Sequence, residues 1–256
     1  MAQAAVVIVG GHEGGATVDV EPLVEYGPLF RAASARQVLE EVVYQVLEST
    51  EGPVCVVPMT LGRDPVLVAD AARTLLPVVE GAGAGRVVLT EPFADATLLT
   101  GWLRVAVGQA VDPANASDIA VVLTAKAFNR FDDAELFRIA HLVKVQTDVP
   151  WLEVALRGGD PDLPDVMDRC KQLGAREFAV IPADFRSATE TPMPDVIDGG
   201  PLLNPSAVSG MLATRIAAAL LKLSRDEDNG IAGGLDADHL HGHGGEPWHE
   251  SDADAG

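Results

Sequence analysis

The amino-acid sequence predicts an α/β protein built from two similar, doubly wound parallel-sheet lobes and a polar C-terminal tail. Short apolar runs that do not alternate with polar residues, such as residues 5–9 and 54–59, are typical of strands buried on both faces. Segments with apolar residues at helical spacing separate these runs, so strands and helices alternate along the chain. The same rhythm begins again near residue 119, after the polar stretch 112–117.

The first half contains three expected strands and three expected helices. Asp64 can cap the second helix and Pro65 can open it, because proline is well tolerated at the first helical position. The stretch 19–30, which holds two prolines, is expected to be irregular. The strands are expected at 5–9, 54–59 and 86–89, and the helices at about 35–49, from 65 onward, and at about 96–110.

The second half repeats this order. The run 177–182 matches 54–58 in pattern, since both are apolar strands that end in proline, and this parallel indicates a diverged duplication. Lobe boundaries are therefore expected at 1–111 and 118–224, and residues 225–256 have so little to bury that they should form a disordered tail. Strands are expected at 119–123, 151–156 and 178–181, and helices at 132–145, 162–173 and about 206–223.

Composition excludes several classes of partner. A net charge of −20 over 256 residues repels nucleic acid phosphates and favours cations, although it also serves plain solubility. No apolar run approaches the roughly 18–20 residues needed to span a membrane and no basic signal region precedes the first strand, so a cytoplasmic protein without membrane partners is expected. Cys55 and Cys170 lie far apart in apolar segments and are expected to be buried, free thiols.

The stretch that follows the first strand holds the best candidates for chemistry. Gly10 and Gly11 let the backbone turn, and His12 and Glu13 come directly after them, at the strand end where open α/β sheets bind ligands. Packing of His12 against a neighbouring loop is the alternative. A phosphate-loop function is not supported, because Ala16 follows where a lysine would be required and no GxGxxG pattern is present.

Two other groups of residues are candidates. Arg63, in the loop after the second strand, suits carboxylates through its planar guanidinium, and Arg157 and Arg186 occupy comparable loops in the second half. A local pair with Asp64 is the alternative for Arg63. Four of the six histidines fall within the tail, where alternating imidazoles can chelate a metal, or where an accidental polar tail needs no function. These histidines are His239, His241, His243 and His249; the remaining one, His141, is expected to be structural.

The chain resembles the class II tetrapyrrole chelatases, which include the sirohydrochlorin cobalto- and ferrochelatases. The resemblance covers nearly all of residues 5–223 but rests mostly on the order of strands and helices. In the first half it is carried by Val7-Ile8-Val9-Gly10-Gly11-His12 and Val56-Val57-Pro58-Met59-Thr60-Leu61-Gly62, and in the second half by residues 118–123, 135–140, 152–156, 164–175 and 179–182.

The resemblance implies insertion of a divalent metal into a sirohydrochlorin-type tetrapyrrole, with cobalt first and nickel or iron as alternatives, and with no organic cofactor. By matching position, His12 would bind the metal and accept pyrrole protons. Glu13 and Glu91 are weaker candidate ligands that could complete the metal site, and Arg63 would hold substrate carboxylates. The family's second histidine is absent, and Arg63 stands in that region.

This departure leaves two other functions open. One is a metal or tetrapyrrole carrier that keeps the fold without catalysis, and the other is an interaction protein with an acidic surface. Assembly into a homo-oligomer is also open. The metal and the tetrapyrrole are the expected partners of a chelatase and of a carrier.

Overall fold

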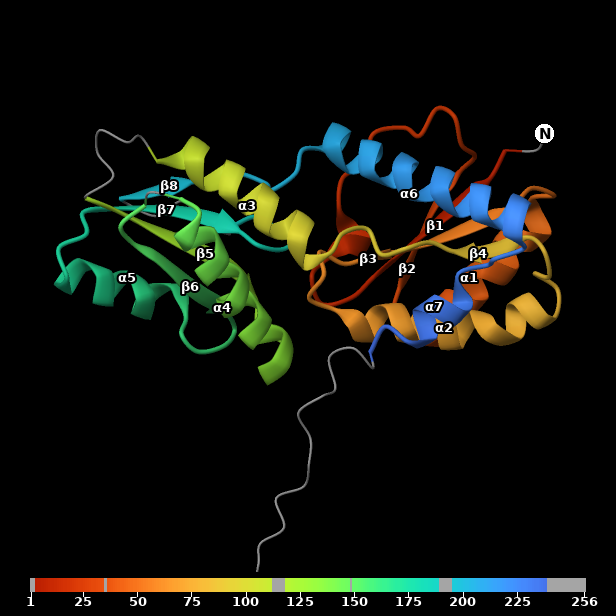
Figure 1. Cartoon of the computed structure of the whole chain (residues 1–256), viewed down its shortest axis with the longest axis horizontal. Coiled ribbons are helices and arrows are strands. Elements are labelled where there is room, and N and C mark those ends of the chain that lie inside the picture. Colours follow the sequence, from red (N-terminus) through yellow and green to blue (C-terminus); the bar gives the residue numbers. More distant parts are fainter. Residues whose placement is uncertain (1–2, 35, 112–117, 148, 189–194, 239–256) are drawn as a thin grey trace, which may run out of the picture.

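The computed structural model describes residues 3–34, 36–111, 118–147, 149–188 and 195–238. Its elements form two four-stranded parallel sheets flanked by helices (Figure 1). The first half contains β1 (Ala5–Gly10), η1 (Gly15–Thr17), β2 (Leu29–Ala33), α1 (Arg36–Ser49), β3 (Val54–Met59), α2 (Pro65–Glu80), β4 (Val87–Leu89) and α3 (Ala96–Ala110). The second half contains β5 (Ile119–Lys126), α4 (Arg130–Val145), β6 (Leu152–Arg157), α5 (Leu163–Gln172), β7 (Glu177–Pro182), β8 (Val196–Asp198), α6 (Pro205–Asp226) and α7 (Ile231–Leu235).

The two sheets have the same topology. The strand orders are β2-β1-β3-β4 and β6-β5-β7-β8, and every neighbouring pair is parallel. The central strands β1 and β3 are buried along their whole length, as their unbroken apolar sequences predict. The predicted fold class, two doubly wound parallel-sheet lobes, is confirmed.

The helices that cover the sheets do not follow chain order. Helix α3, from the first half, packs against strand β7 of the second sheet and against helix α4. Helix α6, from the second half, packs against strands β3 and β4 of the first sheet (Figure 1). One continuous core therefore runs through both lobes and includes Leu103 of α3 and Leu212 of α6. The expected boundaries at 1–111 and 118–224 divide the chain at the polar stretch, but each lobe takes a covering helix from the other half.

Two edge strands and one helix were not predicted. Strand β2 lies in the stretch expected to be irregular, and β8 is only three residues long; both are partly exposed, so neither carries a strong apolar pattern. The expected disordered tail also begins too early in the prediction. Helix α6 continues to Asp226, and α7 buries Ile231 in the core of α1, α2 and the first sheet.

The cysteines and one long helix bear on the remaining expectations. Cys55 and Cys170 are free and buried, as predicted, and burial raises the pKa of the Cys55 thiol to about 12.

Within the described residues, one helix, Pro205–Arg225, has the length and composition to cross a membrane, although no apolar run of that length was expected from the sequence. In this structure Val208, Leu212 and Ile216 of that helix are fully buried against the first sheet.

The packing of α6 on the first sheet should contribute a large part of the free energy of unfolding. Replacing Leu212→Ala removes a fully buried side chain, so we expect the free energy of unfolding to fall by about 2–5 kcal/mol. Leu221→Ala, on the same helix but half exposed, is the matched control and should cost much less. Urea denaturation measures both; equal losses would show that α6 is not held by its buried face.

Candidate interlobe site

The candidate site begins at the carboxyl end of β1, where Gly11 makes room for an acidic side chain. A Cβ atom on Gly11 would lie 2.2 Å from Oδ2 of Asp64, so any larger residue would displace that carboxylate. Asp64 is the cap of α2, as predicted, and its Oδ1 accepts a hydrogen bond from the Leu67 N–H at 3.0 Å. The cap therefore fixes one oxygen of Asp64 and leaves the other to face the turn after β1.

His12 uses that second oxygen. Its Nδ1 lies 2.9 Å from Oδ2 of Asp64, and both side chains are almost completely buried. An ionised carboxylate only accepts hydrogen bonds, so Nδ1 carries the hydrogen and Nε2 of the neutral ring keeps its lone pair. Nε2 is buried and has no hydrogen-bond partner among the described residues. This is the arrangement in which a carboxylate orients a histidine to bind a metal or accept a proton.

Glu13 is buried beside His12, in a site formed by the loop after β3. The Thr60 hydroxyl and the Leu61 N–H, the latter at 3.0 Å, both donate to Oε2 of Glu13, whereas Oε1 has no partner among the described residues. Burial raises the pKa of Glu13 to about 7, against the lowering effects of Arg63, Thr60 and His12. A carboxyl group with this pKa can take up or release a proton near neutral pH.

Arg63 is also buried, at the boundary between the two lobes. Its Nε donates to the main-chain oxygen of Asp132 at 3.4 Å, and its Nη2 lies 3.7 Å from Oδ1 of Asp133. Neither Nη1 nor Nη2 has a hydrogen-bond partner among the described residues. Burial raises the pKa of Asp132. The first turn of α4 thus brings two acids of the second lobe to the site.

The second lobe closes the site with an aromatic ring. Phe128, just before α4, stacks on the imidazole of His12 with the ring centres 4.2 Å apart and the planes 4° from parallel. Nearby, the Phe185 N–H donates to the main-chain oxygen of Glu13 at 3.0 Å. Phe128 is itself 55% exposed, so it forms a cover over a buried histidine. The two lobes are therefore in contact at this point, and the contact covers the imidazole.

The other predicted site residues lie elsewhere. Glu91 is exposed and forms a 3.0 Å ion pair with Lys222, and among the described residues no group of three or more histidine, cysteine or acidic side chains could hold a metal. Glu91 is therefore not brought into a metal cluster with His12 and Glu13. His141 is exposed on α4. The tail histidines His239, His241, His243 and His249 lie outside the described residues.

The three arginines meet different partners. Arg157 bonds to the buried carboxylate of Asp184, so it is engaged within the second lobe. Arg186 is exposed, and its side chain passes beside Gly14 of the first lobe.

The sequence did not identify Asp64 and Thr60 as site residues, although it identified Asp64 as a helix cap. Phe128 was also missed, because an aromatic residue in a loop carries no signal of its contact with a histidine more than a hundred positions away.

Glu13 should make stability depend on pH. The pKa of Glu13 in the folded protein is above the ordinary value of 4.5. The contribution of Glu13 to the free energy of unfolding is therefore largest at low pH and is lost as pH rises through about 7. Relative to the Glu13→Gln variant, we expect the native protein to lose about 2 kcal/mol between pH 5.5 and 8. Parallel urea titrations at several pH values measure this difference. A constant difference across the range would place the pKa of Glu13 at its ordinary value.

Phe128 should shield His12 from reagents in solution. Replacing Phe128→Ala removes the stacked ring, so we expect a several-fold faster modification of His12 by diethyl pyrocarbonate, read by peptide mass spectrometry. Phe131→Ala is the matched control, since Phe131 is 62% exposed on α4 and Arg130, not His12, lies over its ring. Equal rates in the native protein and the Phe128→Ala variant would mean that the closed contact opens readily without this change.

Comparison with known proteins supports the fold. No family model and no curated protein matches the sequence. Among solved structures, SirB from Bacillus subtilis, determined with Fe3+, is similar with a TM-score of 0.54 and 13% identity, over 89% of this chain and 99% of that one. DR2241 from Deinococcus radiodurans is similar with a TM-score of 0.50 and 15% identity, over 85% of this chain. The match spans 55% of DR2241, a multi-domain protein described as similar to chelatases with two additional domains. The two lobes of this chain thus have a chelatase-like fold.

Proposed function

We propose that the protein inserts a divalent metal into a sirohydrochlorin-type tetrapyrrole. The observation that carries the proposal is the buried pair of unpartnered atoms, Nε2 of His12 and Oε1 of Glu13, at the carboxyl end of β1. Burying polar atoms without partners is costly, so their presence between two lobes favours a ligand that they meet when the lobes open. The chelatase-like fold, and a structural neighbour determined with Fe3+, support a metal as that ligand.

The two side chains suit the proton chemistry of this reaction. A divalent metal replaces two pyrrole N–H protons, so two protons must leave the macrocycle for each metal that enters. One passes to Nε2 of His12, which the bond to Asp64 keeps free, and the other passes to Glu13, whose pKa of about 7 allows it to accept and then release the proton. Nε2 of His12 cannot hold a metal and a proton at once, so His12 is proposed as a metal ligand before transfer and as a base once the metal has left it for the macrocycle. Glu13 is proposed as a weaker ligand.

The small number of protein ligands fits a metal that is a substrate. Two protein donors hold a metal weakly, and water and the macrocycle nitrogens would complete its coordination during transfer. Imidazole binds cobalt, nickel and iron, so all three are candidate metals. Cobalt is the first metal to test, and nickel and iron are the alternatives. No organic cofactor is part of the proposal. The tail histidines remain predicted metal ligands for storage or delivery.

Arg63 is proposed to bind a substrate carboxylate. Its Nη1 and Nη2 have no hydrogen-bond partner in the part of the chain that the structure describes, and a guanidinium matches a carboxylate with two parallel hydrogen bonds. The same positive charge repels a metal ion, so the carboxylate would also neutralise the guanidinium while the metal enters. Because Arg63 is fully buried, the lobes must separate before the substrate reaches it.

A carrier without catalysis is the second candidate. It is favoured by the closed contact between Phe128 and His12 and by the presence of Arg63 where the chelatases have a second histidine. A carrier would bind the tetrapyrrole or the metal and release it unchanged. The third possibility is the interaction protein with an acidic surface, which binds neither the metal nor the tetrapyrrole.

Metal insertion can be followed by absorbance when the full-length protein is mixed with sirohydrochlorin and Co2+. We expect insertion to be faster than without protein and to fall by about 10²-fold or more in His12→Ala, because the base and ligand are removed. Asp64→Asn should lower the rate less, since the imidazole remains but is no longer fixed by a carboxylate.

The control for this experiment is His141→Ala, which removes an exposed imidazole from α4 and should leave the rate unchanged. A native rate equal to that without protein, with a spectral shift on mixing, would establish the carrier instead. A protein that neither shifts the spectrum nor changes the rate would exclude both functions.

A further inference from the structure

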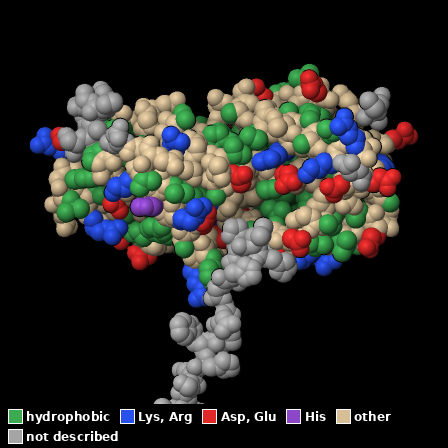
Figure 2. All heavy atoms as spheres, viewed as in Figure 1, with side chains coloured by type: hydrophobic (Ala, Val, Ile, Leu, Met, Phe, Trp, Pro, Cys, Tyr) green, Lys and Arg blue, Asp and Glu red, His purple; other side chains and the backbone are tan. Residues whose placement is uncertain are grey.

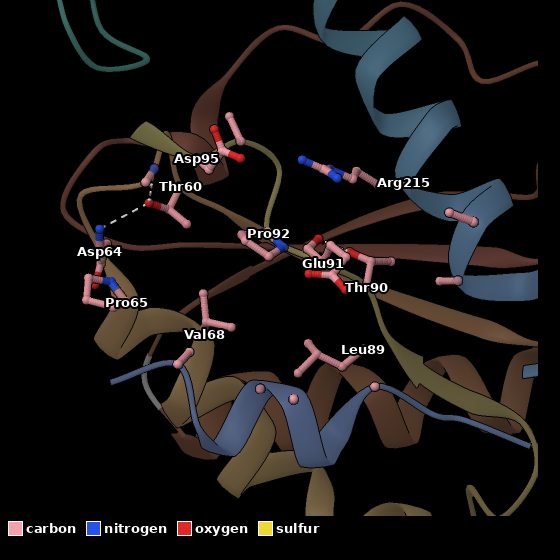
Figure 3. Close-up of a pocket in the computed structure, with 18 of the residues that line it drawn as sticks. Thr60, Asp64, Pro65, Val68, Leu89, Thr90, Glu91, Pro92, Asp95 and Arg215 are labelled. Carbon is pink, nitrogen blue, oxygen red and sulfur yellow. Dashed lines mark hydrogen bonds between the residues drawn. The ribbon is translucent and has the colours of Figure 1, made fainter. Parts of the chain in front are cut away.

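A cavity of about 600 Å³ lies in the first lobe, away from the contact between His12 and Phe128. It is bounded by α6 on one side and by α2 and α7 on the other, beyond the carboxyl ends of β3 and β4 (Figure 3). In the space-filling view it is a hollow with a hydrophobic floor and charged side chains on its rim (Figure 2). Its size is within the range of small-molecule sites.

Two helices contribute small residues to the walls of the cavity. Helix α6 contributes Ala218 and Ala219, and α7 faces it with Gly233 and Gly234. Val88 and Leu89 of β4 also line it. Between Arg215 and Lys222, the side chains that α6 presents to the cavity are therefore only methyl groups, and α7 presents bare backbone. This part of the cavity wall is flat and apolar, which suits a flat ring system more than a branched molecule.

The wall formed by α7 is held firmly in place. The turn before α7 lies against β4, where the Leu89 N–H donates to the main-chain oxygen of Asn229 at 2.9 Å. Gly230 has a φ of +73°, and a Cβ atom there would lie 2.0 Å from the Leu89 oxygen, so only glycine fits. After α7, Asp238 forms an ion pair with Arg73 of α2. The slot is therefore built by specific contacts at both ends of α7.

Two cations lie on the α6 wall, one on each side of the alanines. Arg215 and Lys222 are seven residues apart, which places their Cα atoms about 10 Å apart along the same helix face. Arg215 donates through Nε to the Phe93 oxygen at 3.2 Å, and Figure 3 shows its side chain directed across the pocket toward Asp95. Lys222 pairs with Glu91, but both are half exposed or more, so the pair is weak.

The acids that line the cavity have structural partners. Oδ1 of Asp95 accepts the Leu98 N–H and caps α3, and Oδ1 of Asp228 accepts the Gly230 N–H at 2.9 Å. Asp64 and Thr60 reach the cavity from the loop after β3 and are the residues that hold His12 and Glu13. The slot thus adjoins the interlobe site through these two side chains but does not include His12 or Glu13.

We propose that this slot is a second binding site, which takes a planar apolar ring system carrying at least two carboxylates at its edge. This inference rests on the proposed function, in which such a molecule is the tetrapyrrole substrate. The ring lies between the alanines of α6 and the glycines of α7, and Arg215 and Lys222 each bind a carboxylate at the ring edge. The slot holds the macrocycle outside the closed interlobe site.

The test is a titration of the full-length protein with metal-free sirohydrochlorin, followed by the change in its absorbance. Ala218→Phe fills the slot from an exposed helix position, and we expect Kd to rise at least tenfold. Ala217→Phe is the matched control, since Ala217 is exposed on the same helix and does not line the cavity. Arg215→Gln should raise Kd several-fold. Thermal unfolding of each variant verifies that it is folded.

The outcomes separate this proposal from the proposed function. Weaker binding in Ala218→Phe, with binding unchanged in His12→Ala, supports the slot. Binding that is unchanged in Ala218→Phe overturns the slot, and if metal insertion still depends on His12 the proposed function stands. Failure of the native protein to bind sirohydrochlorin overturns both.

Discussion

The fold depends on one requirement, that two sheets with apolar residues on both faces must be covered on both faces. Helices α1 and α2 cover one face of the first sheet, but the other face is covered by α6, which lies more than a hundred residues further along the chain. The second sheet takes α3 in return. The lobes are thus joined by a shared core as well as by the connecting chain, and the carboxyl ends of β1 and β3 face the second lobe.

The interlobe site follows from this arrangement. The caps and turns after β1 and β3 bring His12, Glu13 and Arg63 together in a buried place, and residues of the second lobe close it. The site atoms of His12, Glu13 and Arg63 that have no hydrogen-bond partner among the described residues are on the first lobe, whereas the cover, Phe128, is on the second. In the proposed function, the atoms that react therefore lie on one lobe and the residue that covers them lies on the other. Movement between the lobes would expose these atoms without disturbing the bonds that orient them.

Much of the fold could be predicted from sequence because buried parallel strands have unmistakable apolar runs. The edge strands β2 and β8 could not, since an edge strand is half exposed and needs no such run. Helix α7 was missed because its glycines resemble those of a tail, although its single buried isoleucine fixes it to the core. His12 and Glu13 were found from their place after a strand. Their partners Asp64 and Thr60 depend on how two loops approach each other, which no local pattern encodes.

Gly11 shows how a residue without any functional group can determine the chemistry of this site. Its missing side chain is what allows Asp64 to reach the imidazole, and a single methyl group would occupy the position of the carboxylate oxygen. The adjacent strand and helix would tolerate that methyl group as ordinary packing strain. In a mutational screen, a Gly11 variant would therefore behave like a variant of Asp64, because its loss would mimic the removal of a carboxylate that is still present in the sequence.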